Sequence, residues 1–464
     1  MNATWLLVLS GALFQSVCST LICIACGIPL AHLLYRYEFP GRRLILASAP
    51  LFFIMPSRVA AACIQSLYGV SGFVGIIATH SFLNMPFVFF IITVAYRSLD
   101  YTLYFAARDL GASAWRGYKD VVIPYLMPTI VAAAALVEIL CFSSHTIPRI
   151  FGCALYHTTP DIMLADAYQQ HEYIASLFYA LMRLCVILPI SLAQRADNPS
   201  PAGAPAERRH LSLRSWRDVA CAAFLLIMIL SMYTPLVALC LKQINQPVFT
   251  FWYSIALGSY DHLLGCTIRQ IVAMSLVIAF VSSCLSLCIS FILCCAQRCI
   301  KVAALSCCIS ISTAIPFLLG GVGCGIVCLW IAQHANASGL LLAIGCHTAF
   351  NYPYAYRIIR ARCSQYDQAW NLSAMSLGAT EWQAFLTVEL PFLIPALWRT
   401  WSITAGLSLV EVGAEGILAH KSIMTMPIAI RLYREHGMHD QVLGLSLITC
   451  FCVWLGAYCI LEKE

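Results

Sequence analysis

Side chains that could hold a metal ion or carry redox chemistry are numerous, because the chain has 24 cysteines among its 464 residues. Cys23 and Cys26 form a C-x-x-C pair, but no second pair follows at the spacing of a zinc site. Nearly all the cysteines lie inside apolar runs such as "SLCISFILCCAQRC", where free cysteine behaves as a small hydrophobe. We therefore expect no metal site and no cofactor.

Candidates for catalysis are few. His145, His157 and Asp161 form a loose set between two apolar runs, but nothing recurs at metal-ligand spacing. The Walker A pattern G-x-x-x-x-G-K-[ST] is absent from the sequence, so we do not expect this chain to hydrolyse ATP. The sequence predicts no catalytic residues and indicates that the chain is not an enzyme.

We expect apolar helices to carry these residues. In this chain 61% of the residues are hydrophobic and only 10% are charged, which is not typical of a soluble domain. A spanning helix needs roughly 20 mostly apolar residues. The first run lacks a basic flank and a cleavage site, so we interpret it as a retained span. The fold class predicted is an all-α polytopic membrane protein with about eleven spans, near residues 5–35, 44–69, 73–96, 126–146, 172–194, 218–241, 264–297, 302–333, 337–359, 391–418 and 442–461.

The basic connections set the orientation, because short loops rich in Lys and Arg stay in the cytoplasm. Eleven spans that start from an outside N-terminus place all the basic loops on one side, among them "RYEFPGRR", "ERRHLSLRSWR", "QRCIK" and "RIIRAR". The net charge of +6 is spread over these loops, which suits membrane topology and not nucleic-acid binding. We expect a multi-pass protein of the bacterial cytoplasmic (inner) membrane, in contact with the lipid bilayer and with no nucleic acid.

A segment rich in Pro, Ala and charge, "QRADNPSPAGAPAERRHLSLRS", reads as a flexible cytoplasmic linker. It predicts a first half at residues 1–194 with about five spans, a linker at 195–215 and a second half at 216–464 with about six.

The halves are related in sequence. One constant shift, which brings His80 onto His347, aligns identical residues between residues 80 and 128, among them the fourteen pairs named below. A parallel repeat of this kind is common in transporters, and we expect a path between the halves. The fourteen pairs are His80 and His347, Asn84 and Asn351, Pro86 and Pro353, Ile91 and Ile358, Ile92 and Ile359, Asp100 and Asp367, Ala107 and Ala374, Leu110 and Leu377, Gly111 and Gly378, Ala112 and Ala379, Trp115 and Trp382, Val121 and Val388, Pro124 and Pro391, and Pro128 and Pro395.

The repeat includes two loops, "AARDLGASAWRGYKDVVIPYLMP" and "SAMSLGATEWQAFLTVELPFLIP", each predicted as helix, turn, helix on the cytoplasmic side. Gly111 and Gly378 suit the left-handed position that ends a helix, and Ser113 and Thr380 then suit an N-cap. Thr380 has a glutamine at the capping-box spacing, whereas Ser113 is followed by an arginine there.

Two prolines in the same loops, Pro124 and Pro391, lie where we expect the second helix to bend or stop before the chain re-enters the membrane. DNA binding by a helix-turn-helix is excluded, because about 25 residues tethered between spans cannot supply the soluble three-helix body.

The spacing A-A-x-x-L-G-A, followed by two prolines, resembles the "EAA" loop of bacterial ABC importer permeases, and two such loops resemble the fused permeases of this family. The resemblance implies a type I importer permease fold whose loops, at about 102–128 and 369–395, each dock on one of two copies of a cytoplasmic ABC ATPase subunit. It implies these coupling residues: Ala106, Ala107, Gly111, Ala112 and Trp115 in the first loop, and Ser373, Ala374, Gly378, Ala379 and Trp382 in the second.

This chain departs from the family pattern at one position in each loop. Phe105 and Leu372 stand where the pattern begins with Glu, so this chain lacks the carboxylate that would form the family's salt bridge to the ATPase. Trp115 and Trp382 suit either an aromatic anchor in an ATPase groove or a residue of the lipid interface, and both readings stay open.

The substrate is indicated by further resemblance. The passages "YRYEFPGRRLIL", "HSFLNMPFVFF", "EILCFSS" and "TTPDIMLADAYQQHEY" are similar to the fused thiamine permeases, which commonly begin with one more span. That family implies thiamine as substrate and a periplasmic or lipid-anchored binding protein as partner. The alternatives are the fused iron(III) permeases and, from another class, an ion- or proton-coupled secondary transporter.

Polar groups inside the spans are the remaining candidates. Glu138 and Glu411 are costly in an apolar span and suit either a cavity or a hydrogen bond to a neighbouring helix. The repeat aligns Glu411 with Ser144, and an acidic and a hydroxyl wall would suit a cation in transit, so these three are our pathway candidates. The repeated His-x-x-x-Asn-x-Pro of His80 and His347 is read as a helix stitch in preference to a proton relay.

Overall fold

The computed structural model describes residues 4–53, 55–152, 160–170, 172–193, 209–210, 215–244, 258, 260–299, 303–335, 338–363, 366–411, 424–438, 441–442 and 444–452. The chain divides into two compact units, Met1–Gln246 and Pro247–Glu464. Each unit is described by itself below.

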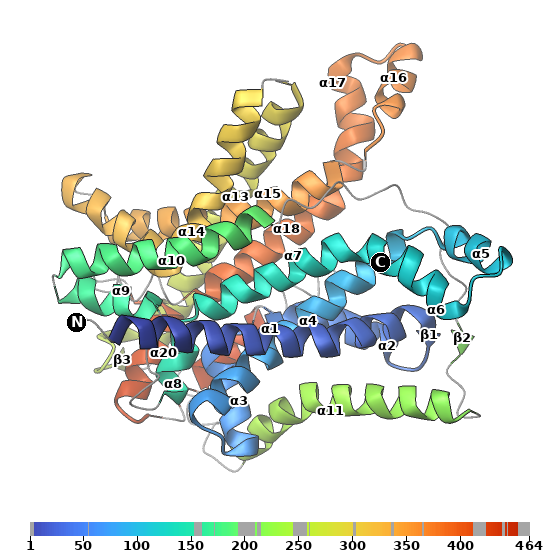
Figure 1. The fold of residues 1–464 in the computed structure, drawn as a ribbon. Helices are drawn as coiled ribbons and strands as arrows, with labels where there is room; N and C mark the ends of the chain where they lie inside the picture. Colours follow the sequence, from blue (N-terminus) through green and yellow to red (C-terminus); the bar gives the residue numbers. More distant parts are fainter. Residues whose placement is uncertain are drawn as a thin grey trace. The chain divides into compact units, whose positions relative to one another are not determined.

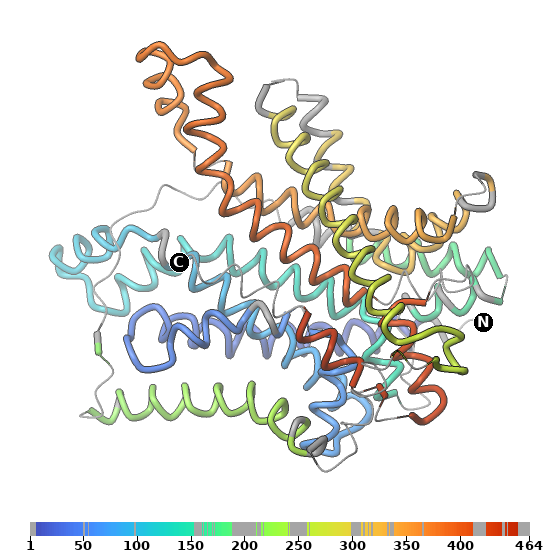
Figure 2. The backbone as a smooth tube through the Cα atoms, turned by 180° about the vertical axis from the view of Figure 1, so that it is seen from behind, coloured from blue at the N-terminus to red at the C-terminus, as the bar shows by residue number. Residues whose placement is uncertain are grey.

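Unit 1 is built on three long helices. α1 packs along α4, and α7 packs against both, as Figures 1 and 2 show. Its elements are α1 (Thr4–Arg36), β1 (Tyr37–Glu38), α2 (Arg42–Phe53), α3 (Ser57–Tyr68), α4 (Gly72–Ser98), α5 (Tyr101–Asp109), α6 (Ala114–Gly117), the π-helical η1 (Tyr118–Val122), α7 (Ile123–Phe142), α8 (Thr146–Phe151), α9 (Pro160–Gln169), α10 (Tyr173–Ala193), β2 (Arg209–His210) and α11 (Trp216–Ile244).

Unit 2 has the same central arrangement, in which α13, α15 and α18 pack pairwise against one another. Its elements are β3 (Tyr260–Asp261), β4 (Cys266–Thr267), α13 (Ile268–Cys299), α14 (Ala303–Ala335), α15 (Gly339–Cys363), α16 (Ala369–Ser376), α17 (Glu381–Ala384), the π-helical η2 (Phe385–Glu389), α18 (Leu390–Val410) and α20 (Met426–Glu435). The strands β3 and β4 form an antiparallel hairpin before α13.

The internal repeat is visible in the element bounds. The shift that aligns His80 with His347 also brings the start of α4 onto the start of α15, at Gly72 and Gly339. It brings α6 and η1 onto α17 and η2 residue for residue. The central three-helix arrangement is therefore formed twice from related sequence.

Five helices in the part of the chain that the structure describes are long and apolar enough to cross a membrane. They are Leu6–Arg36, Gly72–Tyr96, Ala114–Phe142, Asp218–Leu239 and Ile268–Gln297, and each overlaps a predicted span. Shorter apolar helices at Tyr173–Ile187 and Leu319–Ile331 lie within two more of the predicted ranges. The prediction of an all-α polytopic fold is confirmed.

One predicted span is wrong in detail. Residues 44–69 were expected to form one continuous helix, but the chain there forms two, α2 and α3. The second begins after Pro56, whose ring lacks an N–H and disfavours helical backbone in the residue before it. Unit 2 has a matching irregularity, because α14 is kinked at Gly320, which has φ 62° and ψ −178°.

The end of unit 1 extends past the predicted linker. Most of residues 195–215 lie outside the described residues, but Arg209 and His210 form β2, which pairs in parallel with β1. The following helix, α11, packs on α3, and the hydroxyls of Tyr233 and Ser48 are hydrogen-bonded. The boundary between the compact units thus follows α11, whereas the halves predicted from the repeat meet before it.

Candidate functional site

The first of the two repeated loops is a helix-turn-helix made of α5 and α6. Asp100 caps α5, since its Oδ1 accepts a 3.0 Å hydrogen bond from the Thr102 N–H. The helix ends at Gly111, which has φ 89°. The Ala112 N–H then donates to the Ala107 carbonyl at 3.0 Å, the long-range bond of a Schellman ending. The left-handed turn predicted at Gly111 is confirmed.

The second loop repeats this turn in α16 and α17. Gly378 has φ 96°, and the Ala379 N–H donates to the Ala374 carbonyl at 3.2 Å. A Cβ atom added at either glycine would have no neighbouring atom from the rest of the chain within 4 Å, so the positive φ, and not a lack of space, favours glycine there.

The helices after the turns are capped as predicted. Ser113 Oγ accepts from the Arg116 N–H at 3.2 Å, and Thr380 Oγ1 accepts from the Gln383 N–H at 3.3 Å. Only the second loop has the reciprocal bond of a capping box, in which the Thr380 N–H donates to Gln383 Oε1 at 2.9 Å. Each cap uses a side chain to satisfy an N–H that the helix leaves free.

The stop expected at Pro124 and Pro391 is wrong, because each second helix continues through its proline, while the bend stays a prediction. Residues 114–142 form one continuous stretch, in which α6 and η1 lead directly into α7. Just before each proline the chain forms a π turn: the Ile123 N–H donates to the Tyr118 carbonyl, and the Leu390 N–H to the Phe385 carbonyl. The wider turn moves the earlier carbonyls away from the proline ring, so the helix continues into the span.

The predicted coupling residues all lie on these two turns. Ala106, Gly111 and Trp115 are exposed, as are Ser373, Gly378 and Trp382 at the matching positions. Ala107, Ala112, Ala374 and Ala379 are half-buried. In Figure 1 each loop projects at one end of the long helices of its own unit.

Aromatic rings join the first loop to unit 1. The Tyr35 ring of α1 stacks on Tyr96 of α4, with centroids 5.2 Å apart, and on Tyr101 of α5, at 5.6 Å. The hydroxyl of Tyr96 is hydrogen-bonded to that of Tyr118 in η1. These rings connect both arms of the loop to α1 and α4.

A different set joins the second loop to unit 2. Tyr366 lies 5.4 Å from Trp370 and 5.3 Å from Phe392, centroid to centroid. The Arg362 guanidinium lies 3.6 Å from the centroid of the Phe392 ring. The first helix of the unit also contributes, because Phe291 of α13 lies 6.5 Å from Phe385 of η2, centroid to centroid.

Glu138, a pathway candidate, lies within α7 and faces α1. It accepts hydrogen bonds from Ser16 Oγ at 2.5 Å and from Thr20 Oγ1 at 2.8 Å. Of the two readings left open by the sequence, a hydrogen bond to a neighbouring helix is the one that these contacts favour.

The other two pathway candidates lie at helix ends. Ser144 follows α7 and is half-buried, and its N–H donates to the Cys141 carbonyl at 3.3 Å. Glu411 was expected inside a span, but α18 ends at Val410 and Glu411 has extended backbone with φ −63° and ψ 120°. α18 thus ends before the predicted limit at residue 418, and Glu411 stays a pathway prediction.

The repeated histidines stitch helices together, as predicted. His80 Nδ1 lies 2.8 Å from Gln15 Oε1, and Gln15 Nε2 donates to the Cys141 carbonyl at 2.9 Å, which links α4, α1 and α7. In unit 2 His347 Nδ1 lies 2.6 Å from Ser408 Oγ, which is 3.1 Å from Ser282 Oγ.

No metal-binding group appears among the residues that the structure describes, where no three His, Cys, Asp or Glu side chains come together. His145 Nδ1 lies 3.2 Å from Thr146 Oγ1. His157 and the Asp161 side chain, the other two members of the loose set, lie outside the described residues.

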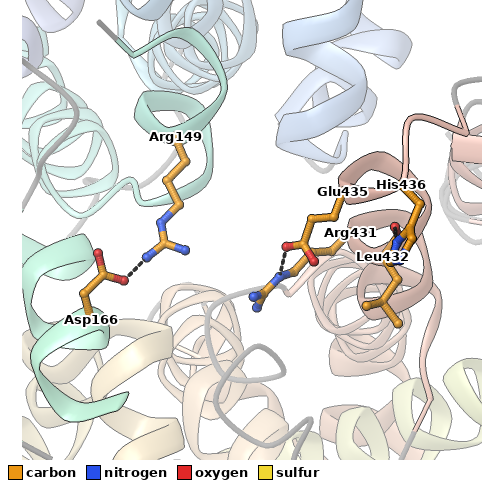
Figure 3. Close-up of polar contacts among 6 residues, drawn as sticks. All are labelled: Arg149, Asp166, Arg431, Leu432, Glu435 and His436. Carbon is orange, nitrogen blue, oxygen red and sulfur yellow. Dashed lines mark hydrogen bonds and ion pairs between the residues drawn. The ribbon is translucent and has the colours of Figure 1, made fainter. Parts of the chain in front are cut away.

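Charged residues that sequence reasoning did not single out lie on α9 and α20, after the ends of α7 and α18 that are remote from the loops. Figure 3 shows Arg149 of α8 paired with Asp166 of α9, and Arg431 Nε donating to Glu435 Oε1 at 2.8 Å within α20. The sequence does contain a signal for α9 and α20. Pro160 of α9 and Pro427 of α20 align under the shift that brings His80 onto His347.

Comparison with known proteins agrees with this arrangement. Residues 24–202 match the family described as binding-protein-dependent transport system inner membrane component.

Similar proteins span nearly the whole chain. The thiamine transport system permease protein ThiP of Escherichia coli is 23% identical, with 97% of this chain and 87% of that protein covered. ThiP of Haemophilus influenzae is 21% identical, with 96% and 86% covered. The probable ABC transporter permease protein y4fN of Sinorhizobium fredii is 26% identical, with 90% and 80% covered. Together with the two repeated loops, these matches identify the chain as an ABC importer inner-membrane permease, a multi-pass transport subunit.

Proposed function

We propose that this permease forms the translocation pathway for thiamine, which a periplasmic or lipid-anchored binding protein delivers and which two copies of a separate ATPase drive across. The observation that supports the substrate is the similarity to proteins named thiamine permeases over almost the entire chain. The duplicated turns at Gly111 and Gly378 support two ATPase copies, since two loops of one geometry offer two equivalent docking sites.

The residues proposed for coupling are those on the exposed turns, namely Ala106, Ala107, Gly111, Ala112 and Trp115 in the first loop and Ser373, Ala374, Gly378, Ala379 and Trp382 in the second. Each loop is a rigid element, because its glycine turn, its cap and its aromatic contacts fix both helices to the spans. Movement of a docked partner would therefore be transmitted to α7 and α18, which continue from the loops.

Glu138, Ser144 and Glu411 stay proposals for the pathway. The Glu138 carboxylate accepts hydrogen bonds from two hydroxyls of α1, which fix its position. A carboxylate of this kind suits a cationic solute such as thiamine. We expect Glu138→Gln to raise the KM for uptake several-fold while the protein stays inserted, and unchanged uptake with a lowered melting temperature would leave Glu138 a purely structural residue.

The test of the function is growth and uptake. A thiamine auxotroph that lacks its own transporter is supplied with this chain, the ATPase and the binding protein encoded in its gene cluster. We expect vanadate-sensitive uptake of labelled thiamine that disappears when the ATPase is left out. Rescue of iron(III) uptake instead would move the assignment to the iron permeases.

A transport assay with the purified permease in proteoliposomes distinguishes an ABC importer from a secondary transporter. Purified permease alone should move no thiamine under an ion or proton gradient. Transport by the chain alone would overturn the proposal.

A further inference from the structure

Both loops expose the same three apolar positions. Leu110 and Leu377, at the tips of the turns, are 90% and 89% exposed. Trp115 and Trp382 are 66% and 67% exposed, and Phe105 and Leu372 are 46% and 65% exposed. Large apolar side chains exposed at the same place twice, on loops that extend beyond the ends of the spans, mark a surface that another molecule covers.

The charges of the two loops do not repeat. Residues 101–122 hold Arg108, Asp109, Arg116, Lys119 and Asp120, whereas the matching residues 368–389 hold only Glu381 and Glu389. The first loop is thus net positive and the second is net negative. One partner present in two copies cannot recognise both loops by charge, because a groove complementary to one would repel the other.

We propose that the apolar triad Phe105, Leu110 and Trp115, repeated as Leu372, Leu377 and Trp382, is the recognition surface for an apolar groove on each ATPase subunit. The inference rests on the proposed function and specifies the chemistry of the same docking site. The groove receives the leucine and the indole ring, and it presents an apolar wall opposite Phe105 and Leu372. No basic group on the partner is required at that position.

The experiment measures binding of the ATPase from the same gene cluster to the full permease in lipid nanodiscs. The first variant carries Leu110→Asp and Leu377→Asp. Both leucines are almost fully exposed, so the melting temperature of the variant should stay that of the wild type. We expect affinity to fall by about ten-fold or more, as for loss of an interface anchor.

A second variant, Phe105→Glu with Leu372→Glu, places a carboxylate against the proposed apolar wall. We expect weaker binding in this variant, because an unpaired charge would be buried. The matched control, Asp109→Asn with Glu381→Gln, removes exposed charges from the same loops and should leave affinity within about two-fold. Wild-type binding should also survive high salt, since apolar contacts are not screened.

Variants changed in one loop only test separately how many ATPase copies bind. Leu110→Asp or Leu377→Asp alone should reduce the number of bound ATPase copies from two to one in native mass spectrometry. Loss of both copies from a single change, or no loss from either, would contradict the proposed surface.

The outcomes separate the two proposals. If the wild-type chain binds no ATPase, the proposed function and this inference both fail. If it binds, but the control pair weakens binding most or the glutamate variant binds more tightly, only the apolar recognition is overturned. Quenching of Trp115 and Trp382 by brominated lipids, measured against a Trp115→Phe and Trp382→Phe variant, together with unchanged ATPase binding by the aspartate variant, would instead assign the surface to the membrane.

Discussion

The two loops have nearly the same backbone but are held by different side chains. Gly111 and Gly378 adopt the same left-handed turn, and a π turn follows each second helix. The first loop is fixed by the Tyr35, Tyr96 and Tyr101 stack, whereas the second relies on Tyr366 and its neighbours. The two units therefore share the backbone conformation of the loop. Each unit fixes that conformation with a different set of aromatic side chains.

The largest expected effect comes from breaking the shared turn. Gly111→Val with Gly378→Val should reduce uptake by more than about ten-fold, because a β-branched residue with positive φ costs at least about 1–2 kcal/mol in each turn. The protein should still insert, since a side chain at either site meets open space. The measurement is labelled thiamine uptake normalised to membrane-inserted protein.

A matched control for the glycine variant is Gly111→Asn with Gly378→Asn. Asparagine also adds a side chain but tolerates the left-handed conformation. It should retain much more uptake than the valine variant. Equal loss in both variants would show that the surface of the turn matters and not its backbone, and normal uptake in the valine variant would refute the role of the turns.

The side-chain hydrogen bonds that join helices in each unit predict a second, smaller difference, in thermal stability. Gln15 links α1 to two other helices, through His80 and the Cys141 carbonyl. Ser282 links α13 to one, through Ser408, and its other bond, to the Ala279 carbonyl, stays within α13. Gln15→Leu leaves buried polar groups without a partner, at about 1–3 kcal/mol. Ser282→Ala should cost about 0.5–1.5 kcal/mol. Thermal unfolding in detergent compares the loss of stability in the two variants. A larger loss for Ser282→Ala than for Gln15→Leu would contradict the expected order.

The smallest effect concerns the caps. Arg116→Gln gives the first loop the capping-box residue that the second already has in Gln383, and we expect a gain of a few tenths of a kcal/mol in local stability, the size of a single side-chain pair on a helix. Gln383→Ala should cost about 0.5–1 kcal/mol in the second loop. Hydrogen exchange of the Ser113 and Thr380 amides reports both changes, and faster exchange at Ser113 in Arg116→Gln would count against the capping argument.

Local features of the loops could be predicted from sequence because short-range rules govern them. The glycine at a helix end, the hydroxyl that caps the next helix and the capping-box glutamine each depend on neighbours within five residues. Because the sequence repeats, each feature predicted in one loop could also be compared with the matching residue of the other loop. The all-α polytopic fold was also predicted, because it depends only on long apolar segments.

Features that depend on distant partners could not be predicted. Glu138 is bonded to Ser16 and Thr20, which lie in another helix more than a hundred residues earlier in the chain. The helix break at Pro56 was missed because an apolar run gives no periodic signal at its interruption. The π turns were missed for a related reason, since the sequence shows a proline but not how the turn before it adapts.

The pairing of β2 with β1, and the packing of α11 on α3, bear on where this polypeptide can be divided. A gene split within residues 195–208 would place β2 and α11 on the second product, although both complete the first compact unit. The first product would then lack two elements that pack on it, and the second would carry them in addition to its own compact unit. A split between Gln246 and Pro247 would instead yield two fragments, each with its own complete set of packed helices.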